Sequence, residues 1–124
     1  MNLVDSCGWL EYFSDGANAD FFEAALKDTK NLLVPTICIY EVFKKILFER
    51  GENPAFQAVG IMNQGTVLGL DFGLAIQSAK LSQEYKMPFV DSVILASARQ
   101  YEAVIWSQDE HFKDIKSIRY IAKR

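Results

Sequence analysis

Hydrophobic residues occur in this chain as short unbroken runs, and between these runs they recur every third or fourth position. Short apolar runs bounded by turn residues are typical of buried strands, and the longer period is typical of helices. About five runs therefore predict strands. These are residues 2–4, 31–34, 67–70, 103–106 and 118–121.

The stretches between the runs carry helix boundary residues. Thr36 is a good N-cap for a helix from Ile37 to Arg50, and Gly51 ends it. Pro88 suits the first turn of a later helix, because its missing N–H would have no partner there. The other predicted helices start near residue 8 or cover 20–27, 54–64 and 72–85.

Alternation of short apolar strands with helices is typical of a parallel sheet covered on both faces. We therefore expect an α/β fold, a three-layer α/β/α sandwich with a central parallel sheet of about five strands. The 124 residues fit one domain, residues 1–124, which is long enough to bury a core without disulfides.

The net charge and the cysteine content limit the classes of function that fit this chain. A net charge of −3 and a pI near 5.1 argue against broad attraction to nucleic acid, so any such role has to be local. Cys7 and Cys38, with one histidine and no CxxC, favour buried thiols over a disulfide framework or a zinc site. The start has no signal-peptide pattern and no membrane span, so a cytoplasmic protein is expected.

Four acids fall where a ligand would bind to such a sheet. Asp5 ends the first strand and Asp109 follows the strand that ends at residue 106, so both belong to the carboxyl edge. Asp91 lies in the first turn of a helix that starts near this edge and runs back to the beginning of the next strand, and Glu41 lies in the second turn of a helix that leaves the edge. In open parallel sheets ligands bind at this edge, near the reversal of strand order.

Each acid also has a purely structural explanation. On its own segment, Asp91 is better explained as a residue that caps the helix or complements its positive end, a role worth about 1 kcal/mol. Asp5 and Asp109 fit turn or cap positions, and Glu41 can pair with the lysines three and four residues later for ~0.3–0.5 kcal/mol. Asp71 follows a strand without a partner acid, so we assign it to capping.

Several carboxylates together need protons or a cation to neutralise them. With one histidine and two thiols in the chain, an oxygen-rich set favours Mg²⁺ or Mn²⁺. Such ions act on phosphates, orienting an attacking water and lowering its pKa. The glycine-rich phosphate loops GxxxxGK[ST] and GxGxxG are absent.

Four segments together resemble the signature blocks of the PIN-domain nucleases, specifically the VapC-type toxins of bacterial toxin–antitoxin pairs. They are residues 3–10, 35–42, 91–98 and 106–112. The resemblance implies an endoribonuclease that holds Mg²⁺ or Mn²⁺ and cleaves RNA with metal-activated water. Asp5, Glu41 and Asp91 match its three acidic positions, Asp109 matches the acid of the fourth block, and Ser107 matches the hydroxyl residue that opens that block.

Two positions depart from the family's pattern. Many relatives have serine or threonine where Cys7 stands, so a hydroxyl that could support Asp5 is missing there, and Ser6 is a candidate to replace it. Many have another acid where His111 stands. We favour an inert loop residue for His111 over a proton carrier, and a direct metal ligand is the least favoured role.

The resemblance also implies a VapB-like antitoxin, an RNA substrate and a homodimer. Aromatic residues on early helices are candidates for an apolar groove that accepts a partner helix, although each one also fits a plain core position. They are Trp9, Tyr12, Phe13, Phe43 and Phe48. Lys44, Lys45 and Arg50 are candidates for contact with the RNA backbone, against the alternative of a solvated helix face.

The rival from another class is a non-catalytic α/β binding module, such as a receiver-like domain in which Asp5 or Asp71 accepts a phosphoryl group. That chemistry normally needs a lysine after a later strand. Ser107 and Gln108 occupy that place instead.

Overall fold

The computed structural model describes all residues from 1 to 124 and contains five short strands, all paired in parallel. Each strand coincides with one of the apolar runs, shifted by one or two residues at its ends. The strands are β1 (Asn2–Val4), β2 (Leu33–Pro35), β3 (Thr66–Leu68), β4 (Val104–Ser107) and β5 (Ile118–Tyr120).

Strand β1 lies in the middle of the sheet. It pairs with β4, with Val4 opposite Trp106, and β4 pairs with β5. An isolated parallel bridge from Asn2 to Leu32 brings β2 beside the other edge of β1, and β2 pairs with β3. The resulting spatial order is β3-β2-β1-β4-β5. The chain adds β2 and β3 on one side of β1 and then crosses to add β4 and β5 on the other side. Parallel α/β sheets bind ligands in the crevice at such a switch point, which here lies between β1 and β4.

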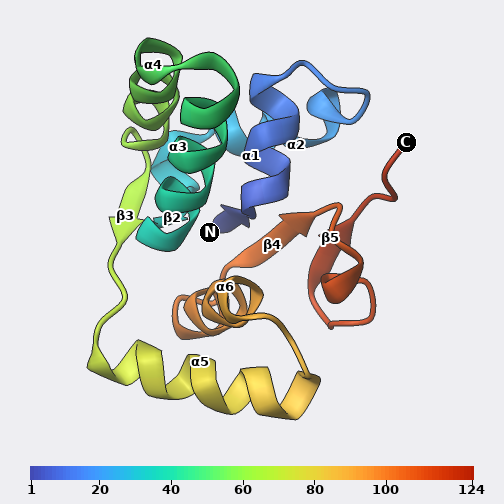
Figure 1. The fold of residues 1–124 in the computed structure, drawn as a ribbon. Helices are drawn as coiled ribbons and strands as arrows, with labels where there is room; N and C mark the ends of the chain where they lie inside the picture. The colour runs from blue at the N-terminus through green and yellow to red at the C-terminus, as the bar shows by residue number, and fades with distance from the viewer.

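Helices cover both faces of this sheet, as the alternating pattern predicts. In Figure 1, α5 and α6 lie below the strands, and α1, α3 and α4 lie above them. The α/β/α sandwich is therefore confirmed. The helices are α1 (Ser6–Phe13), α2 (Ala19–Lys27), α3 (Thr36–Arg50), α4 (Glu52–Met62), α5 (Phe72–Tyr85) and α6 (Phe89–Gln100), with 3₁₀ turns η1 (Thr29–Asn31) and η2 (Glu110–Phe112).

The core explains why one predicted groove residue is not on the surface. Trp9 is buried in the cluster that also holds Leu3, Val4 and Phe22. Of the two alternatives for Trp9, the plain core position is therefore confirmed, because α1 turns this face toward the sheet. Phe48 differs, since 90% of it is exposed.

Two helix starts test the boundary predictions. Thr36 is the first residue of α3, and no side chain caps this helix, so its assignment as the N-cap is wrong by one position. Asp71 accepts a hydrogen bond from the N–H of Leu74 at 2.8 Å, and this confirms its capping role at α5.

No helix of the structure combines the length with the apolar composition that a membrane crossing requires.

Candidate metal centre

Asp5 lies directly after β1, at the point where the chain turns into α1. Its Oδ1 accepts a hydrogen bond from the N–H of Gly8 at 2.8 Å, so the carboxylate caps the helix. Its Oδ2 accepts a hydrogen bond from the hydroxyl of Ser107 at the end of β4. These two hydrogen bonds therefore hold the carboxyl group of Asp5 at the edge of the sheet.

Burial dominates the electrostatics of Asp5. Only 2% of the residue is exposed, and desolvation raises the pKa of its carboxyl to about 7, although the bonds from Ser107 and Gly8 favour the charged form. The nearby charges of Asp109 and Asp91 raise this pKa further. A carboxyl in such a place gains most from a neighbouring cation.

Asp109 follows β4 and faces Asp5 because β4 is the neighbour of β1. Its backbone N–H donates to Ser107 Oγ at 2.8 Å, so one hydroxyl contacts both segments. Its Oδ1 accepts the N–H of His111 at 2.9 Å and caps η2. Like Asp5, Asp109 therefore both caps a helical turn and lines the pocket that the other acids share.

Asp91 lies in the first turn of α6, but it makes no capping hydrogen bond there. The cap preferred from this segment alone is therefore not formed, whereas an acid in the first turn still complements the positive end of the helix. Its Oδ2 lies 2.8 Å from Nδ1 of His111, and the same nitrogen lies 2.8 Å from Oδ1 of Asp109. Burial and repulsion by Asp109 raise the pKa of the Asp91 carboxyl to about 6, while His111 opposes the shift. His111 thus contacts two of the four acids.

Glu41 reaches the same pocket from α3. The alternative explanation, an ion pair with the following lysines, does not hold: Lys45 contacts Glu49 at 3.1 Å, and the Nζ of Lys44 lies 5.6 Å from the ring centroid of Tyr40. Glu41 is therefore free of a cationic partner.

All four predicted acids line one pocket of about 420 Å³ at the carboxyl edge of β1 and β4. No lysine or arginine lines it. The lining residues are Asp5, Ser6, Cys7, Glu41, Pro88, Phe89, Val90, Asp91, Ile94, Asp109 and His111. Carboxylates gathered from separate elements with no basic side chain among them fit a hard divalent cation.

Ser6 and Cys7, which belong to the first signature segment, also line the pocket. The buried Oγ of Ser6 makes no hydrogen bond, so the hydroxyl that supports Asp5 comes from Ser107 and not from Ser6. Cys7 lies close to Asp5 and Asp109, and burial together with these two charges raises the pKa of its thiol to about 12. Cys7 therefore stays a neutral thiol. Ser6 retains a free oxygen at the pocket wall.

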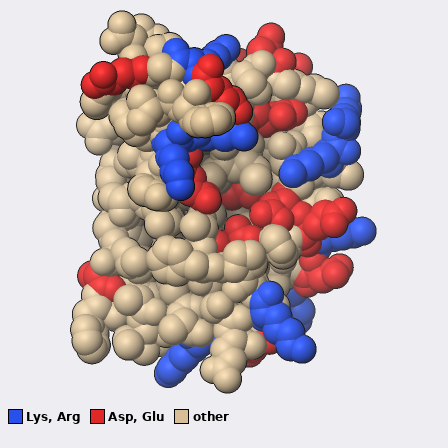
Figure 2. Space-filling model, viewed as in Figure 1, with Lys and Arg blue, Asp and Glu red and all other residues tan.

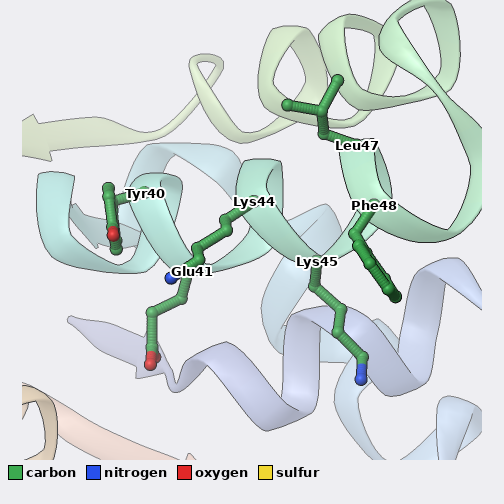
Figure 3. Close-up of a pocket in the computed structure, with 6 residues that line it drawn as sticks. All are labelled: Tyr40, Glu41, Lys44, Lys45, Leu47 and Phe48. Atoms are coloured by element: carbon green, nitrogen blue, oxygen red, sulfur yellow. The ribbon is translucent and has the colours of Figure 1, made fainter.

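Basic and aromatic side chains lie next to this acidic pocket. A hollow of about 610 Å³ lies on α3, and Glu41, Lys44, Lys45 and Phe48 are among the residues that line it (Figure 3). A second hollow of about 610 Å³ shares Cys7 with the acidic pocket and is lined by Lys45, Arg50 and Lys123 among others. The sequence reasoning missed Lys123, because a residue near the chain end has no periodicity that places it.

Figure 2 shows the same separation of charge on the surface. Acidic side chains gather in the middle and toward the right of the face shown, and lysines and arginines lie around them. Although the chain as a whole carries a net negative charge, this face therefore has separate acidic and basic areas.

Comparison with known proteins agrees with this geometry. The PIN domain family model matches residues 3–118. The fold is similar to a toxin–antitoxin complex from Klebsiella pneumoniae, with 20% identity, 95% of each chain covered and a TM-score of 0.80. VapC20 of Mycobacterium tuberculosis, a Sarcin-Ricin loop cleaving toxin, is 16% identical, with 96% of this chain and 98% of that chain covered and a TM-score of 0.80.

A third similar structure is VapBC2 from Rickettsia felis bound to a DNA fragment from their promoter. It is 11% identical, covers 98% of this chain and 97% of that chain, and has a TM-score of 0.73. At these identities the likeness concerns the fold. A sequence search of curated proteins gives no match.

Proposed function

The chain belongs to the PIN domain family, and from this premise we propose that it is a metal-dependent endoribonuclease, the toxin of a type II toxin–antitoxin pair. The observation that carries the proposal is one pocket into which four separate segments bring Asp5, Glu41, Asp91 and Asp109 without a basic side chain. Such an enzyme would act in the cytoplasm, where its RNA substrate is found.

Asp5, Asp91 and Asp109 are the proposed ligands of Mg²⁺ or Mn²⁺, with Glu41 as the fourth acid. When bound, the ion neutralises these carboxylates, polarises a phosphoryl oxygen and activates a water for attack on the phosphodiester. Ser107 and the N–H of Gly8 hold the two oxygens of Asp5. Fixed ligands of this kind are the part of such a site that the protein itself supplies.

The basic residues beside the pocket support a path for the RNA backbone. Lys44 and Lys45 stand in the hollow that includes Glu41, and Arg50 and Lys123 line the hollow that includes Cys7. We propose that these side chains contact phosphates on either side of the cleaved bond. Contacts of this type set the register of the substrate and not its sequence preference.

Partner proteins belong to the same proposal. The exposed Tyr40, Leu47 and Phe48 on α3 offer apolar contacts to a VapB-like antitoxin that would cover the acidic pocket. A second copy of the chain would cover the other exposed apolar area, at edge strand β3 and the start of α5. There Val67, Leu70, Phe72 and Ile76 are exposed, and the left side of Figure 2 is largely free of charge.

The test is RNA cleavage by the purified full chain. We expect cleavage with Mg²⁺ or Mn²⁺, loss of cleavage with EDTA, and recovery when the ion is restored. Asp5→Asn should abolish cleavage. Asp71→Asn is the matched control, because Asp71 also follows a strand and caps a helix but lies outside the pocket.

Unchanged cleavage by rigorously purified Asp5→Asn protein would overturn the proposal. A stable acyl phosphate after incubation with a phosphodonor would favour the receiver-like alternative instead.

A further inference from the structure

His111 occupies a special place at the rim of the acidic pocket. Its Nδ1 lies 2.8 Å from Oδ2 of Asp91 and 2.8 Å from Oδ1 of Asp109. The backbone of the residue is also fixed, because its N–H donates to Asp109. The ring thus lies between the two acids, although 52% of the side chain is exposed and solvent could have accommodated it.

These distances match those between ligand atoms that share one metal ion. An octahedral ion with ligand bonds of about 2.1 Å separates neighbouring ligand atoms by roughly 3.0 Å. The Nδ1 atom and the two carboxylate oxygens are already close to this spacing and could occupy adjacent coordination positions after a small outward shift. Asp91, Asp109 and His111 also form one of the two groups of the chain whose ligand atoms lie within 4.8 Å of one another.

We propose that Nδ1 of His111 is itself a ligand of the divalent ion, together with Asp91 and Asp109, and that this nitrogen makes the centre prefer Mn²⁺ to Mg²⁺. The inference rests on the proposed function, because it concerns the same metal centre. Mg²⁺ strongly favours oxygen ligands, whereas a transition metal accepts imidazole nitrogen readily. A histidine in place of a carboxylate therefore changes which ion is selected.

Ligation requires one rearrangement of protons. A nitrogen that binds the ion carries no proton, so an imidazolium ring would release its Nδ1 proton to solvent when it ligates. The neutral ring then carries its proton on Nε2. No redox change and no further reactant is involved.

The test exploits the fact that the chain contains a single histidine. Full-length protein without a polyhistidine tag is loaded with Mn²⁺ in a buffer free of nitrogen ligands, and electron spin echo envelope modulation is recorded. We expect a ¹⁴N coupling of directly bound imidazole. The coupling should change to that of ¹⁵N when the protein is labelled with ¹⁵N-histidine, and it should be absent from His111→Asp.

The binding of the two ions gives an independent measurement. By titration calorimetry, we expect His111→Asp to lower the preference for Mn²⁺ over Mg²⁺ by about tenfold, since it replaces nitrogen by oxygen. His111→Asn, which has no charge, should weaken Mn²⁺ binding more than Mg²⁺ binding. Circular dichroism checks that both variants are folded.

The outcomes separate this inference from the proposed function. Stoichiometric Mn²⁺ binding without a ¹⁴N coupling would overturn the role of His111 and leave the carboxylate centre standing. An unchanged ion preference in His111→Asp would overturn the selectivity. Absence of any Mn²⁺ binding to the wild-type chain would overturn both the inference and the metal centre.

Discussion

The hydroxyl of Ser107 donates a hydrogen bond to Oδ2 of Asp5, although the two residues are 102 positions apart in the sequence. The Oγ of Ser107 also accepts a hydrogen bond from the backbone N–H of Asp109 at 2.8 Å. One buried side chain therefore links the acid that ends β1 to the acid that follows β4. This contact adds to the pairing of β1 with β4, which aligns the first and fourth segments of the site.

Ser107→Ala should shift metal binding to higher pH. The hydrogen bond from Ser107 lowers the pKa of Asp5 against the effect of burial, so its loss should raise that pKa further. We expect the pH midpoint of Mn²⁺ binding to rise by about one unit, measured by calorimetry across a pH series. Ser97→Ala is the matched control, since Ser97 is equally buried but donates to Val93 inside α6. Equal effects of both substitutions would contradict the proposed link.

Asp5→Asn should stabilise the metal-free protein at neutral and higher pH while it abolishes cleavage. The pKa of Asp5 is about 7 in the folded chain and ~3.9 in the unfolded chain. Between these values the unfolded chain has released the proton and the folded chain still holds it, so wild-type stability falls as pH rises from ~4 to about 7. The neutral asparagine avoids this loss.

We expect a gain of roughly 1–3 kcal/mol in the unfolding free energy of Asp5→Asn at pH 8 and none at pH 4, from urea titrations in EDTA. A gain of the same size at both pH values would show that the charge of Asp5 is not its cause.

Metal binding by the wild-type chain should weaken as pH falls below about 7. The carboxyls of Asp5 and Asp91, with pKa values of about 7 and about 6, take up protons in this range, and a protonated carboxyl cannot ligate the ion. Each carboxyl should reduce the affinity by at most about tenfold per pH unit below its pKa. Calorimetry with Mg²⁺ from pH 5 to 8.5 measures this, and an affinity independent of pH would contradict it.

Gly8→Ala should destabilise the fold and disturb the site together. A Cβ at this position would lie 2.5 Å from Cγ1 of Val4 and 2.7 Å from Cε1 of Phe22, both in the core. The same residue donates its N–H to Asp5. We expect a loss of about 1–3 kcal/mol in the unfolding free energy, measured by urea titration. Gly60→Ala is the control, because a Cβ there meets nothing within 4 Å.

The proposed homodimer predicts a different sensitivity for two exposed phenylalanines. Phe72 at the start of α5 is 86% exposed beside the edge strand β3, and Phe48 on α3 is 90% exposed beside the acidic pocket. Phe72→Ser should weaken self-association by about 1–2 kcal/mol, and Phe48→Ser should not. Sedimentation equilibrium of the antitoxin-free chain measures both. Weaker self-association of Phe48→Ser alone would place the dimer contact on α3.

Local sequence was sufficient for most of the secondary structure. Apolar runs identified each strand, and for β1 and β2 the reason is burial, since a strand covered on both faces needs consecutive apolar residues. Asp71 was correctly assigned to helix capping. Four acids were expected to meet on the basis of strand ends, helix turns and the family resemblance, and the structure brings all four to one pocket. Their roles as ligands stay predictions.

The tertiary structure decided what neighbouring side chains do to these acids. The sequence of α6 alone favours a cap for Asp91, yet Asp91 contacts His111 from another segment. The hydroxyl partner of Asp5 comes from Ser107 and not from the adjacent Ser6. Burial of Trp9 follows from the face that α1 turns to the sheet. Hydrophobic periodicity is a local property, whereas these contacts follow from the order of β1 beside β4, which is set by packing between segments about a hundred residues apart.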